Sequence, residues 1–436
     1  MTEQEYKGKK VAFYTLGCKL NYAESSAMAR KFEALGFEQV DYKDQADVYV
    51  INSCTVTAES DKKSRNLIRT AMKRNPNALM MVTGCYAQLK SNEISNIDGV
   101  DYVLGSGEKM NITGYINNFN KNENTLVRVS DYKNIDQFFS AYSFGGRTRT
   151  FLKVQDGCNY FCTYCTIPMA RGKSRSDTIE NTVAEARKVA EAGVKEIILT
   201  GVNIGDFGRK HNENFFGLVK ALDKVEGLER IRISSVEPNL LSDEIIEFVV
   251  GSQRIVPHFH LPLQSGSNEV LKLMKRKYTR EVFTSRVEKI KSLMPHAFIG
   301  VDVIAGTNGE TEEHFLDSYN FIRDQDISQL HVFPYSEREG TAALKIPHKV
   351  PVHERKTRVQ KLIELSERKH RLFYEKHLGT SQKVLFEHKA RKNKIQGWTD
   401  NYIRVETEHN PDFENKVFDF SLENINQEGV VTGKIL

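Results

Sequence analysis

Residues 151–165 read FLKVQDGCNYFCTYC, an apolar strand-like run followed at once by a loop with three cysteines. Cys158, Cys162 and Cys165 have the spacing C-x3-C-x2-C. A structural zinc site needs four ligands, and no fourth cysteine or histidine stands near this loop. A 4Fe–4S cluster also prefers four thiolates, so three leave one iron open to a substrate. Zinc and three buried structural cysteines stay as alternatives, although tightly grouped thiols favour a metal centre.

The strand in this stretch is the first of a series that alternates with helical patterns such as TIENTVAEARKVAEAG. We predict its strands at 151–155, 196–200, 231–235, 259–263, 299–306 and 330–335. In such α/β folds the loops at the carboxyl ends of the strands carry the chemistry. Six β–α units indicate a central partial (β/α)6 barrel, which lacks two units of a closed one.

Upstream, about the first 105 residues alternate strands with amphipathic helices. The strands are predicted at 11–16, 48–52, 79–83 and 102–105. This alternation predicts a doubly wound parallel α/β domain with helices on the faces of its sheet.

Three further cysteines lie far apart in this upstream part. Cys18, Cys54 and Cys85 each stand one to three residues past the end of a predicted strand, in TLGCKLN, NSCTVT and TGCYAQ. Loops at the carboxyl ends of neighbouring parallel strands lie side by side, so the three cysteines should converge. A second three-thiolate cluster is the favoured interpretation, and buried core cysteines are the alternative.

The end of the chain changes character after Gly379. Short predicted strands alternate there with turn-forming residues, and they lie in SQKVLFEHK, NYIRVETE, VFDFSL and GVVTGKIL. This pattern predicts a small all-β barrel. Residues 377–436 hold 8 Lys and Arg against 9 Asp and Glu, so only a local patch could meet phosphate. We expect the module to be separable from the chemistry of the rest of the chain.

Composition narrows the class of protein. The 436 residues carry 62 Lys and Arg against 57 Asp and Glu, a net charge of +5 that permits an anionic partner without proving one. The start, MTEQEYKGKK, has no apolar secretory segment, and no run is long enough to span a membrane. We therefore expect a cytoplasmic protein without a membrane partner, in which the six cysteines are reduced.

The chain contains, in this order, the motifs TLGCKLN, INSCTVT, KSRNLIR, VTGCYAQ and QDGCNYFCTYC. Together they resemble the motifs of the radical S-adenosylmethionine (SAM) methylthiotransferase family. They look most like its MtaB-type subgroup. The resemblance covers nearly the whole chain and implies an N-terminal cluster domain at 8–120, a linker at 121–143, a radical SAM core at 144–375 and an RNA-binding TRAM domain at 377–436.

The family implies an enzyme with two 4Fe–4S clusters, ligated by Cys18, Cys54 and Cys85 and by the catalytic Cys158, Cys162 and Cys165. Two SAM molecules would supply a methyl group and a radical, and a reducing electron donor and a sulfur donor would be needed. The MtaB type adds a methylthio group to carbon 2 of N6-threonylcarbamoyladenosine, in the anticodon loop at position 37 of the tRNA. The alternatives are isopentenyladenosine tRNA, a ribosomal protein, or a non-catalytic iron–sulfur protein that binds RNA.

Further residues are candidates for SAM contacts, as in the superfamily. Each follows a predicted barrel strand, and together they are Gly201, Asn203, Ser235, Glu237, Gln264 and Ser265. Ordinary βα turns and a helix cap at Ser267 are the alternatives. Where many members have a phenylalanine–proline–glycine–glutamate turn, residues 307–310 read TNGE, which leaves the packing there open.

The threonylcarbamoyl group carries a carboxylate, which a buried pocket must pair with a cation. Arg147, Arg149 and Arg171 are the candidates for this role. Basic runs at 274–280 and 388–394 could contact RNA, with Lys389, Arg391, Lys392 and Lys394 as the patch on the β-module, and solvated surface charge is the alternative.

Overall fold

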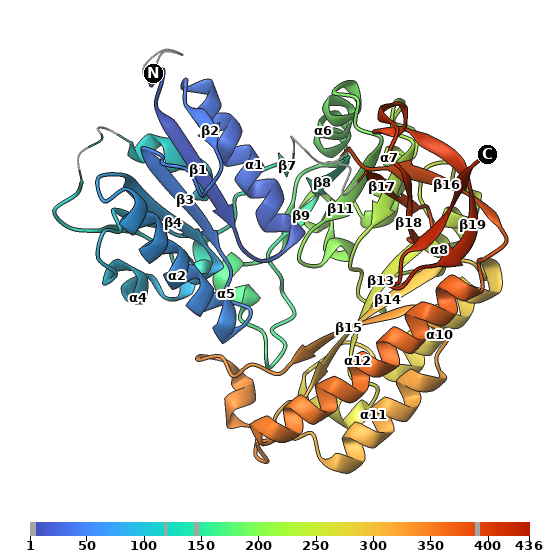
Figure 1. The fold of residues 1–436 in the computed structure, drawn as a ribbon. Coiled ribbons are helices and arrows are strands. Elements are labelled where there is room, and N and C mark those ends of the chain that lie inside the picture. The colour runs from blue at the N-terminus through green and yellow to red at the C-terminus, as the bar shows by residue number, and fades with distance from the viewer. Residues whose placement is uncertain (1–5, 117–118, 120, 144–147, 389–392) are drawn as a thin grey trace. The chain divides into compact units, whose positions relative to one another are not determined.

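The structure is a computed structural model that describes residues 6–116, 119, 121–143, 148–388 and 393–436. The described residues divide into two compact units that interleave along the chain (Figure 1). Unit 1 takes residues 1–144, 151–177 and 336–341, and unit 2 takes residues 145–150, 178–335 and 342–436. The two sets of three cysteines both belong to unit 1.

Unit 1 is built on a parallel sheet whose strand order is β2-β1-β3-β4-β5-β6. The strands are β1 (Lys10–Thr15), β2 (Glu38–Val40), β3 (Val48–Ser53), β4 (Leu79–Gly84), β5 (Tyr102–Leu104) and β6 (Leu126–Arg128). The central strands β3 and β4 are buried along their whole length, which explains their continuous apolar sequence.

Helices cover both faces of this sheet, which confirms the doubly wound fold. They are α1 (Lys19–Ala34), α2 (Ala58–Arg74), α3 (Cys85–Leu89) and α4 (Ser91–Ser95). Side chains alternate across the strands, so Val48 and Val50 of β3 pack with Phe32 of α1 in one core. On the opposite face, Tyr49 and Ile51 of β3 share a second core with Ile68 of α2.

Short elements precede and follow the cysteine loop at 158–165. They are η1 (Lys109–Tyr115), η2 (Tyr132–Asn134), β7 (Ala141–Tyr142), β8 (Arg149–Lys153), β9 (Gln155–Asp156), α5 (Ile167–Arg171) and β10 (Arg175–Ser176). They belong to unit 1 except for the first two residues of β8, which belong to unit 2. Strands β9 and β10 pair antiparallel and hold the two ends of this loop together. Strands β6 and β7 fall within 121–143, the stretch expected to act as a linker.

Unit 2 contains the remaining strands of the predicted partial barrel. They are β11 (Glu196–Thr200), β12 (Arg230–Ile233), β13 (His258–Gln264), β14 (Phe298–Ala305) and β15 (Gln329–Pro334). The pairs β11–β12, β13–β14 and β14–β15 are parallel, and isolated parallel bridges join Ile231 to Ile255 and Ser235 to His260. All six predicted barrel strands are present, which confirms this part of the fold.

Helices and short helical turns separate these strands. The helices are α6 (Ile179–Glu191), α7 (Phe215–Leu222), α8 (Asp243–Gly251), α9 (Asn268–Leu273), α10 (Arg280–Leu293), α11 (Glu312–Asp324) and α12 (Val352–Glu375). The turns are η3 (Ile204–Asp206), η4 (Arg209–His211) and η5 (Ala342–Lys345). No helix among the described residues is long and apolar enough to cross a membrane.

The C-terminal module is a closed barrel, which confirms the predicted all-β barrel, and it has five strands in the order β16-β17-β18-β20-β19 where the sequence predicts four. Its elements are β16 (Ser381–Phe386), β17 (Lys394–Thr399), β18 (Arg404–Glu408), η6 (Pro411–Phe413), β19 (Val417–Ile425) and β20 (Val431–Ile435). Its core is continuous with the rest of unit 2, because Phe298 of β14 and Phe373 of α12 pack in the same cluster as Phe386 and Phe420.

Candidate cluster-binding site

The cysteines of the N-terminal set stand just past the ends of adjacent strands. Cys18 caps the start of α1 after β1, Cys54 follows β3, and Cys85 is the first residue of α3 after β4. Because β1, β3 and β4 are neighbours in a parallel sheet, their carboxyl ends meet along one edge. The structure therefore brings these three cysteines to the same edge of the sheet.

Two of these loops approach so closely that a glycine is required between them. Gly17 has a φ of 95°, and a Cβ atom at this position would lie 2.9 Å from the Sγ of Cys54. Burial, together with the charges of Cys85 and Cys18, raises the pKa of Cys54 to about 11. Cys18 is exposed, whereas Cys54 and Cys85 are buried. A metal centre would favour the thiolate forms that burial disfavours.

The second set of cysteines lies in the loop between β9 and α5. The backbone N–H of Cys158 donates to the carbonyl oxygen of Gly172 over 3.1 Å, and that of Cys165 donates to Cys162 over 3.0 Å. Gly157 has a φ of 68°, and a Cβ atom there would lie 2.1 Å from the carbonyl oxygen of Lys173. The loop can therefore start its turn only with glycine at this position.

The aromatic residues of this loop differ in exposure. Tyr160 and Tyr164 are half-buried, but Phe161 keeps 53% of its surface exposed and has a φ of 43°. A left-handed backbone is unfavourable for an aromatic residue, and such outliers gather at functional sites. Phe161 is therefore held outward at a backbone cost.

Among the described residues, no group of three or more Cys, His, Asp or Glu side chains lies close enough to hold one metal ion. Three thiolates on one zinc ion, each about 2.3 Å from it, would form such a group. A 4Fe–4S cluster binds each thiolate to a different iron, which needs a wider spacing. Each set offers three thiolates, which is one fewer than a closed structural zinc site needs and leaves one iron of a 4Fe–4S cluster open.

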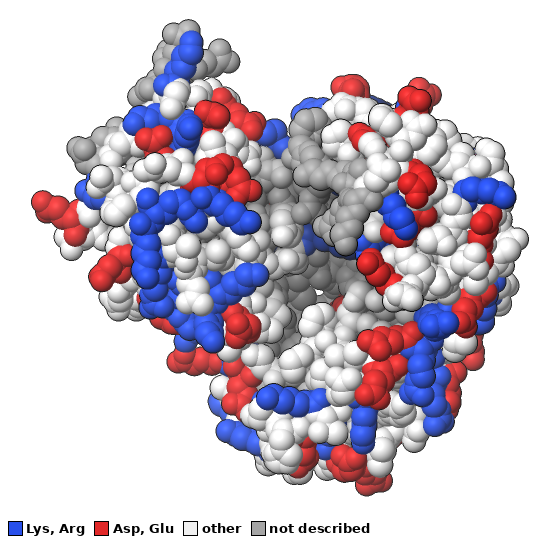
Figure 2. Space-filling view, viewed as in Figure 1, with Lys and Arg blue, Asp and Glu red and all other residues white. Residues whose placement is uncertain are grey.

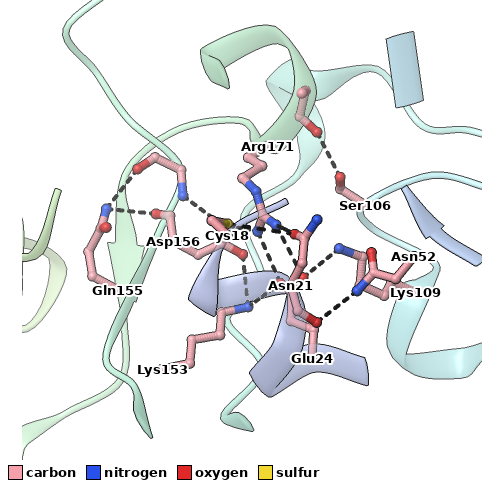
Figure 3. Close-up of polar contacts among 12 residues, drawn as sticks. Cys18, Asn21, Glu24, Asn52, Ser106, Lys109, Lys153, Gln155, Asp156 and Arg171 are labelled. Atoms are coloured by element: carbon pink, nitrogen blue, oxygen red, sulfur yellow. Dashed lines mark hydrogen bonds and ion pairs between the residues drawn. The ribbon is translucent and has the colours of Figure 1, made fainter. Parts of the chain in front are cut away.

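A buried ion network lies beside Cys18 and includes Asp156, which precedes the second set of cysteines (Figure 3). Glu24 of α1 accepts from Lys109 Nζ over 2.6 Å, from Lys153 Nζ over 3.0 Å and from Arg171 Nη1 over 3.0 Å. Arg171 also donates to Asn21, whose side-chain oxygen lies 4.0 Å from the Sγ of Cys18. The carboxylate of Glu24 thus joins three elements beside the N-terminal cysteines.

Asp156 is the second carboxylate of this network. It lies two residues before Cys158 and contacts Arg171 Nη1, Lys153 Nζ and Arg175 Nη2, each over 2.9 Å. Helix α5, which ends at Arg171, also packs on α3, which begins at Cys85. The loop of the second set is therefore fastened to the elements that carry the first.

The network holds more buried cations than buried carboxylates. Its carboxylates are Glu24 and Asp156, and its cations are Lys109, Lys153, Arg171 and Arg175, all of them buried. Burial would raise the pKa of Glu24, but Arg171, Lys109 and Lys153 outweigh it and hold this pKa below its usual range.

The excess positive charge faces the cysteines. Burial raises the pKa of Cys85, whereas the cations Arg171 and Lys109 act to lower it. Buried charge is costly unless it is balanced, and thiolates carrying an iron–sulfur cluster would supply negative charge at this place. The electrostatics of unit 1 therefore fit an anionic centre on these cysteines.

The residues predicted to contact SAM all lie at or after strand ends in unit 2. Asn203 is buried after β11, and Glu237 follows β12, where Arg276 forms an ion pair with it. Burial raises the pKa of Glu237, and Arg276 opposes the rise. Gly201 is half-buried next to the end of β11, and Ser235 forms a parallel bridge with His260.

The turn after β13 has polar contacts of its own. Gln264 has a φ of 67°, an unfavourable backbone for this residue type. The hydroxyl of Ser265 donates to Ser318 over 3.4 Å and accepts from the N–H of Ser267 over 3.2 Å. Contact of these residues with SAM stays a prediction. The strained backbone at Gln264 favours a functional role there.

The TNGE turn is well packed although its apolar pair is absent. Asn308 donates to the carbonyl oxygen of Ala343 over 2.9 Å. The carboxylate of Glu310 accepts from the N–H of Gly306 over 2.6 Å and from Arg358 over 2.9 Å. Polar contacts therefore replace the packing that the sequence left open.

The three arginines suggested as partners for the carboxylate of the substrate differ in their surroundings. Arg171 is buried in the network, so its guanidinium is already committed. Arg149 stacks on the ring of Trp398 with its Cζ 4.9 Å from the ring centre and lies 3.4 Å from Glu387. Arg147 lies outside the described residues.

The basic runs are partly neutralised. Arg276 and Arg280 of the 274–280 run pair with Glu237 and Asp317. On the β-module, Lys394 pairs with Glu406 over 3.0 Å. Lys389, Arg391 and Lys392 fall outside the described residues.

The sequence reasoning named Arg171 only as a candidate for the substrate carboxylate and missed the buried network around it. One signal was present, because Glu24 lies in the buried stripe of α1 between Leu20 and Met28 at helical spacing. A carboxylate in an apolar stripe points to buried cationic partners. Nothing in the local sequence of Lys109 or Lys153 identifies them as those partners.

Comparisons with known proteins show the family of this chain. A model of the uncharacterized protein family UPF0004 matches residues 10–105, and a model of the radical SAM superfamily matches residues 152–322. The chain is similar to the threonylcarbamoyladenosine tRNA methylthiotransferase MtaB of Bacillus subtilis, with 43% identity over 91% of this chain and 89% of that protein. The protein of the same name from Aquifex aeolicus is 41% identical over 92% of this chain and 97% of its own.

A solved structure shares the fold at low identity. The radical SAM methyltransferase TsrM from Kitasatospora setae, solved with cobalamin and a [4Fe-4S] cluster bound, superposes with a TM-score of 0.57. It covers 75% of this chain and 75% of its own and is 14% identical.

Proposed function

The chain belongs to the radical SAM methylthiotransferases of the MtaB type, tRNA-modifying enzymes that use SAM and 4Fe–4S clusters, and we propose that it adds a methylthio group to carbon 2 of N6-threonylcarbamoyladenosine next to the anticodon. The reaction takes two SAM molecules and two clusters. Cys158, Cys162 and Cys165 hold one cluster, and Cys18, Cys54 and Cys85 hold the other.

The observation that carries this proposal is the pair of three-cysteine sets in one compact unit. Each set ends one ligand short of the four thiolates that a 4Fe–4S cluster prefers, so each leaves room for another ligand. Sulfur insertion needs a place for the sulfur as well as a place where SAM is cleaved. The substrate assignment is supported by the names of relatives that are 41–43% identical.

The chemistry divides between the clusters and the chain. When bound, the clusters supply an electron for the reductive cleavage of SAM and a place for the transferred sulfur. Carbon 2 of the adenine base is neither acidic nor electrophilic enough for acid–base chemistry, which is why a radical is required. The chain holds the two cysteine sets in fixed relation through Glu24, Asp156 and Arg171, and Glu237 and Gln264 are candidates to bind SAM.

Nucleoside analysis tests the proposal directly. Purified, reconstituted enzyme is incubated with SAM, dithionite and sulfide and with matched tRNA transcripts that carry threonylcarbamoyladenosine or isopentenyladenosine. We expect mass spectrometry of the digested tRNA to show methylthiolation of the first transcript alone. Equal turnover of both transcripts, or turnover of the isopentenyl substrate alone, would contradict the substrate assignment.

A non-catalytic role and a ribosomal substrate each have a readout of their own. Formation of 5′-deoxyadenosine from SAM separates an enzyme from a non-catalytic iron–sulfur protein that binds RNA. Peptides from ribosomal proteins of a deletion strain, analysed beside its tRNA, separate a ribosomal substrate from a tRNA substrate. The electron donor and the sulfur donor of the cell are replaced by dithionite and sulfide in this assay.

A further inference from the structure

Helix α2 carries a row of basic side chains on its outward face. Lys62, Lys63, Arg69 and Lys73 are exposed, whereas Ile68 on the opposite side packs into the core. The spacing 62, 69 and 73 keeps three of the cations on one side of the helix. Blue side chains gather over α2 in the space-filling view (Figure 2).

These cations are not neutralised by the protein. No acidic side chain forms an ion pair with Lys62, Lys63, Arg69 or Lys73 in the part of the chain that the structure describes. Of the two acidic residues in the first turn of α2, Asp61 is buried and pairs with Arg338, and Glu59 is exposed and forms no ion pair with these cations among the described residues.

Helix α10 of unit 2 shows the contrasting arrangement. Its half-buried cations face acidic side chains, as in the pairs Arg286–Asp243 and Lys289–Glu247. A solvated helix surface commonly mixes the two signs of charge in this way. The uncompensated row on α2 therefore indicates an anionic partner.

The start of α2 is fixed to a cluster-binding loop. The helix begins at Ala58, four residues after Cys54. Arg338 donates to the hydroxyl of Thr55 over 2.5 Å and to the carboxylate of Asp61 over 2.6 Å, which ties this loop to the first turn. At 1.5 Å per residue, the row from Lys62 to Lys73 extends about 16 Å along the helix axis.

We propose that this face of α2 binds the phosphate backbone of the tRNA anticodon arm and directs the target base toward the N-terminal cysteines. The inference rests on the proposed function, because it takes tRNA as the substrate. A nucleotide whose base reaches Cys54 keeps its neighbouring phosphates within a short distance of this loop. Lysine and arginine contacts to phosphate give affinity without reading sequence, and they release counterions.

The test uses the full-length holoenzyme with Lys62→Ala, Arg69→Ala and Lys73→Ala combined. Binding of a tRNA bearing threonylcarbamoyladenosine is measured by fluorescence anisotropy at several salt concentrations. Each lost phosphate contact lowers the slope of log affinity against log salt by about 0.7–0.9, so we expect a fall of about two to three and at least about tenfold weaker binding at low salt. Iron content and SAM cleavage without tRNA should not change.

A matched control separates this effect from a change in net charge. Lys188→Ala, Arg286→Ala and Lys289→Ala combined remove three exposed or partly exposed cations that pair with acidic groups in unit 2. This control should keep the salt slope of the parent enzyme, and Lys62→Arg with Lys73→Arg should also keep it. An unchanged slope in the α2 variant, or an equal fall in the control, would overturn the inference.

The two proposals fail in different ways. If the α2 variant keeps its salt slope while the parent methylthiolates threonylcarbamoyladenosine, the inference about α2 is wrong and the proposed function stands. If the parent binds tRNA through α2 but modifies another nucleoside, the substrate assignment is wrong and the surface stands. A parent enzyme that does not bind tRNA would overturn both.

Discussion

At the scale of single residues, Glu24 is one of the two buried carboxylates that join the cysteine-bearing segments of unit 1. It is buried and accepts from Lys109, Lys153 and Arg171. Glu24→Gln keeps the shape of the side chain but leaves these cations with less negative charge. Removing one partner of a buried pair costs about 3–5 kcal/mol, and we expect a loss of this size in urea unfolding of the apoprotein.

The surface pair Arg65–Glu93 provides the control for this prediction. Glu93 keeps 44% of its side chain exposed, so solvent screens its charge. Glu93→Gln should therefore change the free energy of unfolding by less than about 1 kcal/mol. Similar losses in the two variants would show that the network does not support the fold.

The cysteines give a second residue-scale prediction, because the two sets are separate in the sequence. Cys158→Ala should lose about half of the bound iron of the reconstituted protein and all reductive cleavage of SAM. Cys54→Ala should lose a similar share of iron and still cleave SAM, but it should transfer no methylthio group. Iron analysis, 5′-deoxyadenosine formation and nucleoside analysis measure these results. Continued thiolation of tRNA by Cys54→Ala would make the N-terminal set structural.

The placement of the six cysteines could be predicted from the sequence, whereas the charged residues around them could not, and the difference has a physical reason. A cysteine just past a strand end follows from local pattern, because parallel strands end at one edge. The partners of Glu24 lie 85, 129 and 147 residues away in the sequence. Their meeting depends on tertiary packing, which no local pattern encodes.

At the scale of elements, the buried strands were predictable and the short edge strands were not. Strands β3 and β4 are buried at every position, so their apolar runs are continuous. Strands β2 and β6 have three residues each and are largely exposed or half-buried. An edge strand of this kind has no apolar face to reveal it.

Strand β17 was missed because its glycine looks like a turn. Gly397 and Trp398 occur in KIQGWT, which lies inside the barrel sheet. A Cβ atom at Gly397 would lie 2.6 Å from Val384 Cγ1 and 2.8 Å from the carbonyl oxygen of Leu385. The glycine thus allows two strands to approach closely, a role that composition does not distinguish from a turn.

At the scale of the whole molecule, the C-terminal barrel is part of the core of unit 2. Phe298 of β14 and Phe373 of α12 pack in the barrel's own cluster. Arg230 donates to the carbonyl oxygens of Trp398 and Lys383 over 2.8 and 2.7 Å. From the sequence we expected a module that is separable from the chemistry of the rest of the chain. Because of these contacts, we expect its removal to disturb the rest of unit 2.

Deletion of residues 377–436 is the prediction that follows from this shared core. The deletion would expose the rings of Phe298 and Phe373 to water and would leave Arg230, which is buried, without its carbonyl partners. Each large apolar side chain newly exposed costs about 1.5–3 kcal/mol, so unit 2 should melt at a markedly lower temperature and SAM cleavage should fall with it. Hydrogen exchange should locate the loss of protection in β14 and α12. A truncated protein that melts and cleaves SAM like the parent would show that the barrel only rests on unit 2.

Because the deletion perturbs unit 2 itself, a role of the barrel in RNA binding has to be measured with surface substitutions in the full chain. One such substitution is Lys394→Ala. An unchanged slope of log tRNA affinity against log salt in this variant would exclude that lysine from the tRNA interface.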